Sequence, residues 1–142
     1  MTVRSPGSAR AALGLLFVAA ASTGLPAALF PRTFYDDFPF LAHWVDLLPP
    51  YNHHLVTDVG GLYLGFAVLF AWALWTLDVT LVRAACAGWL LMEALHLIFH
   101  ATHLEGFSTA DGVAEIVSLT LLLLAPLLAI WAVGAPARPS TA

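Results

Sequence analysis

The sequence has no lysine, a single cysteine and little charge of either sign. Only 10% of its 142 residues are charged and 61% are hydrophobic, whereas a soluble domain normally carries about 25% charged residues. The lone Cys86 excludes an internal disulfide. The five basic residues are scattered and the net charge is −4, which excludes a basic surface for nucleic acid. The shortage of charge therefore favours an integral membrane protein.

The motifs of common enzymes are also absent. There is no glycine-rich phosphate loop, no Cys-x-x-Cys pair and no nucleophile motif with a partner base, so hydrolase or kinase chemistry is not expected. What the sequence does contain is long apolar runs. A helix needs about 20 apolar residues to cross a bilayer, and four runs meet this requirement. They cover about residues 11–30, 55–77, 81–103 and 113–134.

Short connections join the last three runs, so consecutive helices should be antiparallel neighbours. We therefore predict an all-α integral membrane protein, a single domain with a four-helix up-down bundle. The long loop at residues 31–54 is rich in aromatic residues and predicts a short interfacial helix over about Phe38–Leu48. Residues 135–142 are expected to form a disordered tail. An alternative for the first run is a cleaved signal peptide over residues 1–27.

Arginine predicts the orientation in the membrane. With both termini in the cytoplasm, four arginines are cytoplasmic and only Arg32 is outside, which the positive-inside rule favours. We therefore expect a multi-pass protein of the plasma membrane, with the loop at residues 31–54 on the extracytoplasmic side. Its expected partners are the lipid bilayer and either other membrane subunits or further copies of itself.

Two further patterns concern packing. Gly61 and Gly65 form a Gly-x-x-x-Gly on the second run, which close packing within the bundle would explain. Four tryptophans fall toward the cytoplasmic ends of their runs, where they are expected to form an interfacial aromatic belt. They are Trp72, Trp75, Trp89 and Trp131.

Ionisable residues interrupt the third apolar run. Glu93, His96, His100 and His103 fall within roughly 80° of one another at about 100° per residue, so they form one stripe on a helix. At about 1.5 Å per residue, Glu93 lies about 15 Å from His103, near the middle of the bilayer. Ionisable residues at this depth are costly and usually functional.

Polar pairs on the neighbouring runs are expected at the depth of the outer part of this stripe. His54 and Asp58 are four residues apart on the second run, and Asp111 and Glu115 are four apart at the start of the fourth. This spacing places both members of a pair on one helix face. We therefore expect three helices to present one His/carboxylate cluster at the extracytoplasmic side.

The first functional interpretation of this cluster is a metal-binding or redox-associated site. Histidine and carboxylate ligands on facing helices suit zinc, iron or copper. The candidate ligands are His54, Asp58, His96 and His100. The candidates for supporting ligands or for a proton relay are Glu93, His103, His53, Asp111 and Glu115. No residue is assigned a catalytic role.

Three alternatives stand beside the metal site. A b-type haem could lie between two opposed imidazoles, but Asp58 and Glu93 would then lie close to its propionates, which disfavours it. A proton or quinone site would use a desolvated, neutral Glu93 as the start of a relay through His96. In the structural alternative the polar groups only join helices. The protein would then be a non-catalytic accessory subunit of a larger membrane complex.

Three segments of the sequence carry a family resemblance: FPRTFYDDFP, PPYNHHLVTDVGGLYLGFAVL and LIFHATHLEGFSTADG. Together they resemble a group of uncharacterised small membrane proteins of actinobacterial type, over about residues 30–125. The match depends on the pattern Asn-x-His-Leu-x-x-Asp-x-Gly from Asn52 to Gly60 and on the histidine-rich end of the third run. The plan is similar to that of the four-helix DoxX-like proteins, which are linked to thiol or quinone redox chemistry. Because this chain lacks a cysteine pair, the thiol chemistry does not carry over.

Overall fold

The computed structural model describes residues 3–48 and 50–135. Within these residues the chain forms five α-helices and no strand, so the all-α prediction is confirmed. Four of the helices are long and apolar enough to cross a membrane, in agreement with the four predicted runs. The predicted tail lies outside the described residues from residue 136 onward. The helices are α1 (Pro6–Leu29), α2 (Pro31–Asp37), α3 (His53–Thr76), α4 (Val79–Ala101) and α5 (Thr109–Val133).

Local sequence signals account for the starts of the helices. Pro6 and Pro31 occupy the first turns of α1 and α2, where a missing backbone N–H has little cost. The side chains of Asn52, Asp78 and Ser108 cap α3, α4 and α5 by accepting hydrogen bonds from backbone N–H groups. The connections that lead into α3, α4 and α5 therefore each end at a residue that satisfies the first turn of the next helix.

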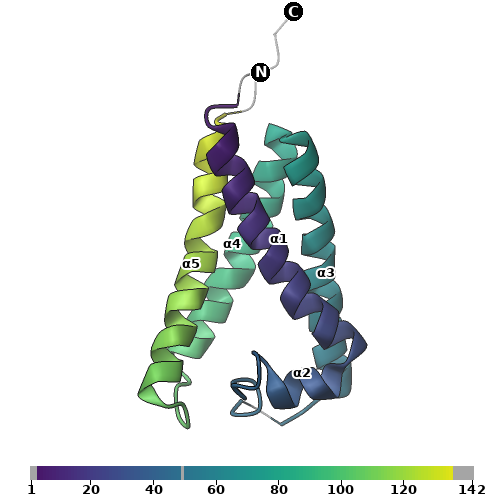
Figure 1. The fold of residues 1–142 in the computed structure, drawn as a ribbon, viewed down its shortest axis with the longest axis vertical. Helices are drawn as coiled ribbons and strands as arrows, with labels where there is room; N and C mark the ends of the chain where they lie inside the picture. Colours follow the sequence, from purple (N-terminus) through teal and green to yellow (C-terminus); the bar gives the residue numbers. More distant parts are fainter. Residues whose placement is uncertain (1–2, 49, 136–142) are drawn as a thin grey trace, which may run out of the picture.

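The four long helices form two pairs that diverge. α1 packs along α3 and α4 packs along α5, while α1 also crosses α5 (Figure 1). A tight turn joins α3 to α4, but the backbones of the two helices come close at few positions. The start of α1, the α3–α4 turn and the end of α5 lie at one end of the molecule, and α2 lies at the other. We call the first the arginine end, because it carries Arg4, Arg10 and Arg83, and the second the loop end.

Hydrogen bonds to backbone carbonyl oxygens hold the arginine end together. The N–H of Ser5 donates to the carbonyl oxygen of Ala132 at 2.9 Å. Nη1 of Arg83 donates to the carbonyl oxygen of Gly134 at 3.2 Å. These bonds connect the starts of α1 and α4 to the end of α5, so the wedge formed by the helix pairs is closed at this end.

The hydrophobic core occupies only the half of the molecule next to the arginine end. It is built from the first half of α1, the second half of α3, the first half of α4 and the last turns of α5. Leu13, Leu16, Phe70 and Val82 are among its fully buried side chains. Lipid tails are as apolar as these residues, so close packing rather than exclusion of water stabilises this core in a membrane.

Trp89 stands at the centre of the core and not at the membrane interface. Its indole makes edge-to-face contacts with Tyr63, Phe66 and Phe70 of α3, at centroid distances of 5.7, 5.4 and 5.3 Å. Its Nε1 donates to the carbonyl oxygen of Leu122. The prediction that Trp89 belongs to an aromatic belt is therefore wrong, because its face of α4 points at α3.

A glycine lets α1 and α3 approach closely, but it is not part of the predicted pair. A Cβ added at Gly60 would lie 2.3 Å from the backbone nitrogen of Ala28, so only glycine fits there. A Cβ at Gly61 or Gly65 would meet nothing within 4 Å. The explanation of the Gly61–Gly65 pair by packing within the bundle is therefore wrong, because this pair faces outward.

The interfacial helix predicted over Phe38–Leu48 is also wrong. The short helix comes earlier, as α2, and residues 38–48 form turns and bends. Pro39 supplies no backbone donor for a helix. Phe40, Leu41 and His43 have positive φ angles, which lie outside the right-handed helical region. These residues end the helix before the range that the aromatic pattern suggested.

Candidate functional site between α4 and α5

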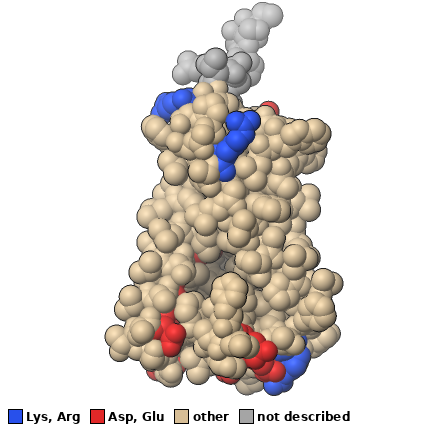
Figure 2. Space-filling model, in the orientation of Figure 1, with Lys and Arg blue, Asp and Glu red and all other residues tan. Residues whose placement is uncertain are grey.

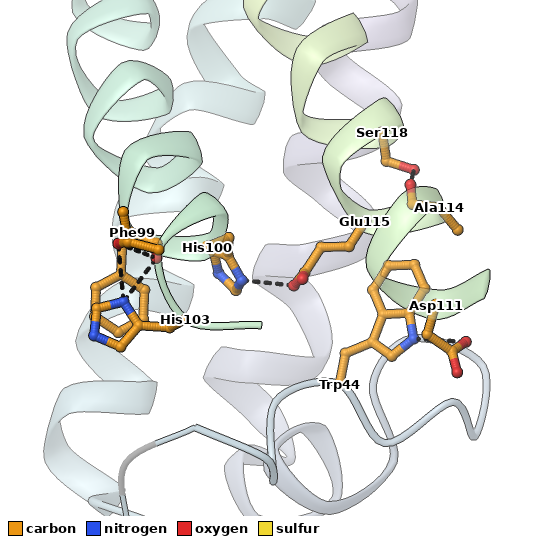
Figure 3. A network of polar contacts seen from close by, with 9 residues as sticks. Trp44, Phe99, His100, His103, Asp111, Ala114, Glu115 and Ser118 are labelled. Carbon is orange, nitrogen blue, oxygen red and sulfur yellow. Dashed lines mark hydrogen bonds and ion pairs between the residues drawn. The ribbon is translucent and has the colours of Figure 1, made fainter. Parts of the chain in front are cut away.

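A buried ion pair joins α4 to α5 in the half of the molecule that has no hydrophobic core. Nδ1 of His100 lies 2.6 Å from Oε1 of Glu115, and the two side chains are only 10% and 4% exposed (Figure 3). The imidazole is not aligned for a regular hydrogen bond to this oxygen. The short separation brings the imidazole and the carboxyl into direct polar contact, which is an ion pair when the imidazole is protonated.

Glu93 lies deeper in the molecule and has no polar partner. It is 1% exposed, and neither of its carboxyl oxygens has a hydrogen-bond partner among the described residues. Trp89, the last buried residue of the α4 core, is four residues away toward the arginine end. An unpaired buried carboxylate costs far more free energy than a buried carboxylic acid. This environment therefore favours the protonated, uncharged form of Glu93.

His96 lies between Glu93 and the buried pair along α4. Its ring stacks on that of His100, with a centroid distance of 4.6 Å and an interplanar angle of 21°. Glu93 precedes His96 by three residues, which places both on one face of α4. These side chains form a line from the middle of the span toward the loop end. We call Glu93, His96, His100 and Glu115 the polar row.

His103, the predicted last member of the α4 stripe, turns away from this row. The helix ends at Ala101, and His103 is exposed. Its ring stacks on that of Phe99 at 4.1 Å, and its Nδ1 contacts the carbonyl oxygen of Phe99 at 2.8 Å (Figure 3). The stripe is therefore shorter than predicted, because helical spacing no longer applies at its last residue.

The α3 pair that was expected in the site lies on another face. Nε2 of His54 is 3.3 Å from Oδ2 of Asp58, and these side chains are 86% and 57% exposed. At about 100° per residue they stand roughly 120° and 160° around the helix from Gly60, which packs on α1. His53 is exposed too and contacts the hydroxyl of Tyr51 through Nδ1 at 2.9 Å. None of the three histidine or acid side chains at this end of α3 faces α4.

The four predicted metal ligands therefore do not converge. His54 and Asp58 contact each other at the surface of α3, whereas His96 and His100 stack on each other beside α5. In the described ranges, no group of three or more histidine, cysteine or acidic side chains could hold a metal ion. The cluster was predicted from three helices, but only α4 and α5 contribute to it. The rotation of α3 about its axis turns His54 and Asp58 outward.

Asp111, at the start of α5, connects the site to the long loop. Its Oδ1 accepts a hydrogen bond from Nε1 of Trp44 at 3.2 Å (Figure 3). Its other oxygen accepts a hydrogen bond from the hydroxyl of Ser108. Glu115 follows Asp111 by four residues, on the same face of α5. The loop thus reaches from α2, beside α1 and α3, to the start of α5, and it spans the wide end of the wedge.

The loop end is acidic, and one face of the molecule is hollowed next to it. Figure 2 shows this hollow between α5 and α1, above α2, with acidic side chains in red at its margin. Arg32, the basic residue at this end of the described chain, donates Nε to Oδ2 of Asp36 at 2.7 Å, which raises the pKa of Arg32. Acidic residues with exposed or half-exposed side chains at this end are Asp36, Asp37, Asp46, Asp58, Glu105 and Asp111.

Comparisons with protein-family models, with curated proteins and with solved structures find no match to this chain. The resemblance to the DoxX-like plan, with its redox chemistry, stays a prediction.

Proposed function

We propose that this is a small multi-pass membrane protein whose polar row binds and relays protons. The observation that supports this most is the buried carboxyl of Glu93, which has no hydrogen-bond partner. A carboxyl that only joined helices would need a partner, as Glu115 has in His100. A carboxyl that is neither paired nor solvated within a membrane span is of the kind that takes up and releases protons.

Protons reach Glu93 along the row in this proposal. An imidazole can accept a proton on one nitrogen and release it from the other, so the stacked rings of His96 and His100 can pass it on. Glu115 holds the outer end of the row and stands four residues from Asp111, where α5 begins. The row therefore connects the polar loop end with the middle of the span.

The charges of the two ends support an orientation for the relay. Among the described arginines, Arg32 is at the loop end and the other three are at the arginine end. The positive-inside rule then places the arginine end in the cytoplasm, with an up-down arrangement of the four spans. The hydrophobic core closes that end, so the row exchanges protons with the outer side and is not a channel.

Infrared difference spectroscopy at neutral pH tests the charge state on which this proposal depends. The wild-type protein should show the carbonyl stretch of a protonated carboxylic acid that is lost in Glu93→Gln. Glu105→Gln, the same substitution at an exposed acid of the loop end, should leave that band in place. The proposal fails if Glu93→Gln instead removes a carboxylate band, because Glu93 is then ionised.

A second candidate function is that of a non-catalytic subunit in a larger membrane assembly. The outward-facing glycines favour it, because Gly61 and Gly65 would let another membrane helix approach closely. Gly61→Leu and Gly65→Leu should then reduce the mass of the assembly in mild detergent without changing the infrared band of Glu93. An unchanged mass would indicate that lipid covers this face.

A further inference from the structure

We propose that the hollow at the loop end binds a hydrophobic organic monocation, with ionised Glu93 as its counter-ion. This inference rests on the proposed function, because the same carboxyl holds the proton when no cation is present. The exchange conserves charge: one cation enters, and Glu93 releases one proton through His96 and His100 to the outer side. The binding region comprises the polar row and the aromatic side chains at the end of the core.

The charges of the row indicate a ligand with a single positive charge. His100 and Glu115 lie 2.6 Å apart, and a single proton held between them, on either side chain, makes the pair neutral. Glu93 has no such partner. Its ionisation leaves one uncompensated negative charge in a low-dielectric setting, and a monocation restores neutrality.

The donor set indicates that the cation is organic rather than metallic. Across the described part of the chain, histidine, cysteine and acidic side chains form no group of three that could hold a metal ion. A metal ion in this position would lose its hydration shell without enough ligands to replace it. An alkylated or arylated cation has a weak hydration shell and apolar substituents, so it suits an apolar cavity with one carboxylate.

Aromatic rings lie directly beyond Glu93 and supply the second element of cation recognition. Trp89 is four residues before Glu93 on the same buried face of α4, and its indole packs edge-to-face against Tyr63 and Phe66. The faces of such rings attract cations, and Trp does so most strongly. Glu93 therefore stands one helical turn from a buried aromatic cluster, which combines charge compensation with an apolar setting.

The field of the molecule favours the approach of cations from the loop end. The acids at this end outnumber the single Arg32, which is already bound to Asp36, and the other described arginines lie at the opposite end (Figure 2). Such a distribution raises the local concentration of cations and slows anions. The hollow lies on the acidic half of the molecule (Figure 2).

Other titratable groups near Glu93 set the conditions for the exchange. They are His96 and His100 on α4, Glu115 on α5 and Tyr63 on α3, while the half of α1 beyond the core, residues 21–29, contains no titratable side chain. Protonation of His96 would repel a cation. Binding should therefore be stronger at pH 8 than at pH 5, where imidazoles and carboxylates both take up protons.

Equilibrium binding to the purified full-length protein in lipid nanodiscs tests this inference. The probes are benzyltrimethylammonium and tetraphenylphosphonium, with tetraphenylborate as an anion of nearly the same shape as the larger cation. Wild-type protein should bind at least one of the two cations saturably, and Glu93→Gln should weaken this binding about tenfold or more. Glu105→Gln should bind like wild type.

A measurement on the unmodified protein makes the test independent of how well the variant folds. In weakly buffered solution at neutral pH, binding should release about one proton for each cation bound. Equal cation affinity in Glu93→Gln, equal binding of the borate anion, or no saturable binding of either cation would each overturn the inference.

The failure of this inference can be distinguished from the failure of the proposed function. If the infrared band of protonated Glu93 is present and no cation binds, only the ligand is wrong. If Glu93 carries no proton at neutral pH, the relay itself is wrong.

Discussion

Nδ1 of His100 and Oε1 of Glu115 stand 2.6 Å apart across the interface of α4 and α5, beyond the end of the hydrophobic core. At the arginine end the same two helices contribute apolar side chains such as Val82 and Ala129 to that core. The ion pair therefore joins α4 to α5 at the loop end, whereas apolar packing joins them at the arginine end.

Removal of either partner should weaken the α4–α5 contact. We expect His100→Ala and Glu115→Ala each to lower the free energy of unfolding by about 1–2 kcal/mol, because polar contacts between membrane helices have strengths up to this range. The double variant should lose less unfolding free energy than the two single variants together, because the second substitution removes a group that already lacks its partner. Unfolding in mixed detergent micelles, followed by circular dichroism, measures all three.

Ser118 provides the control for this cycle. Its hydroxyl donates to the carbonyl oxygen of Ala114 within α5, and its side chain points away from α4 (Figure 3). The effects of Ser118→Ala and His100→Ala should add. If His100→Ala and Glu115→Ala are also additive, the short contact contributes no coupling energy and α4 is held to α5 by other packing.

The four spans could be predicted from the sequence because the apolar character of a run does not depend on which neighbour the helix meets. The rotation of each helix about its axis does depend on that neighbour. His54–Asp58 and Asp111–Glu115 have the same four-residue spacing, yet only the second pair lies at the site. The difference originates at Gly60, whose contact with Ala28 turns the other pair outward.

The site was predictable where it stays within one helix. Glu93, His96 and His100 share a face of α4, as helical spacing requires. The prediction was wrong only for His103, because the helix ends before that residue. The contact of Trp44 with Asp111 was not predictable, because it joins a turn-rich loop to a helix 67 residues away in the sequence. No periodic pattern encodes such a contact.

Alanine substitutions at two adjacent glycines of α3 should have opposite effects on the free energy of unfolding. A Cβ at Gly60 would lie 2.3 Å from the nitrogen of Ala28, whereas a Cβ at Gly61 meets nothing within 4 Å. We expect Gly60→Ala to lower the free energy of unfolding by about 1–3 kcal/mol through overpacking. Gly61→Ala should raise it by up to about 1 kcal/mol through helix propensity. Equal effects in the same micelle assay would mean that α1 and α3 do not meet at Gly60.

The bond between Trp44 and Asp111 should control the mobility of the long loop without governing global stability. Trp44→Phe keeps an aromatic ring but removes the donor, and we expect faster hydrogen exchange in residues 38–48 with a loss of no more than about 1 kcal/mol in unfolding free energy. Trp75→Phe, at an exposed tryptophan of the arginine end, is the matched control. Unchanged exchange in Trp44→Phe would show that other contacts hold the loop.

Replacement of the unpaired acid should stabilise the protein and abolish its proposed activity. Glu93 is 1% exposed and neither carboxyl oxygen is bonded, so its burial has a desolvation cost that no described contact offsets. Glu93→Leu, of similar volume, should raise the free energy of unfolding by about 1–3 kcal/mol. It should also remove the infrared band of the protonated acid and the binding of cations.

Such a gain in stability with a loss of function is the mark of a residue kept for its chemistry rather than for the fold. Glu105→Leu, at an exposed acid, should change the unfolding free energy by less than about 0.5 kcal/mol. If Glu93→Leu instead destabilises the protein as much as His100→Ala, the carboxyl has a structural partner. The relay would then lose the observation that supports it most.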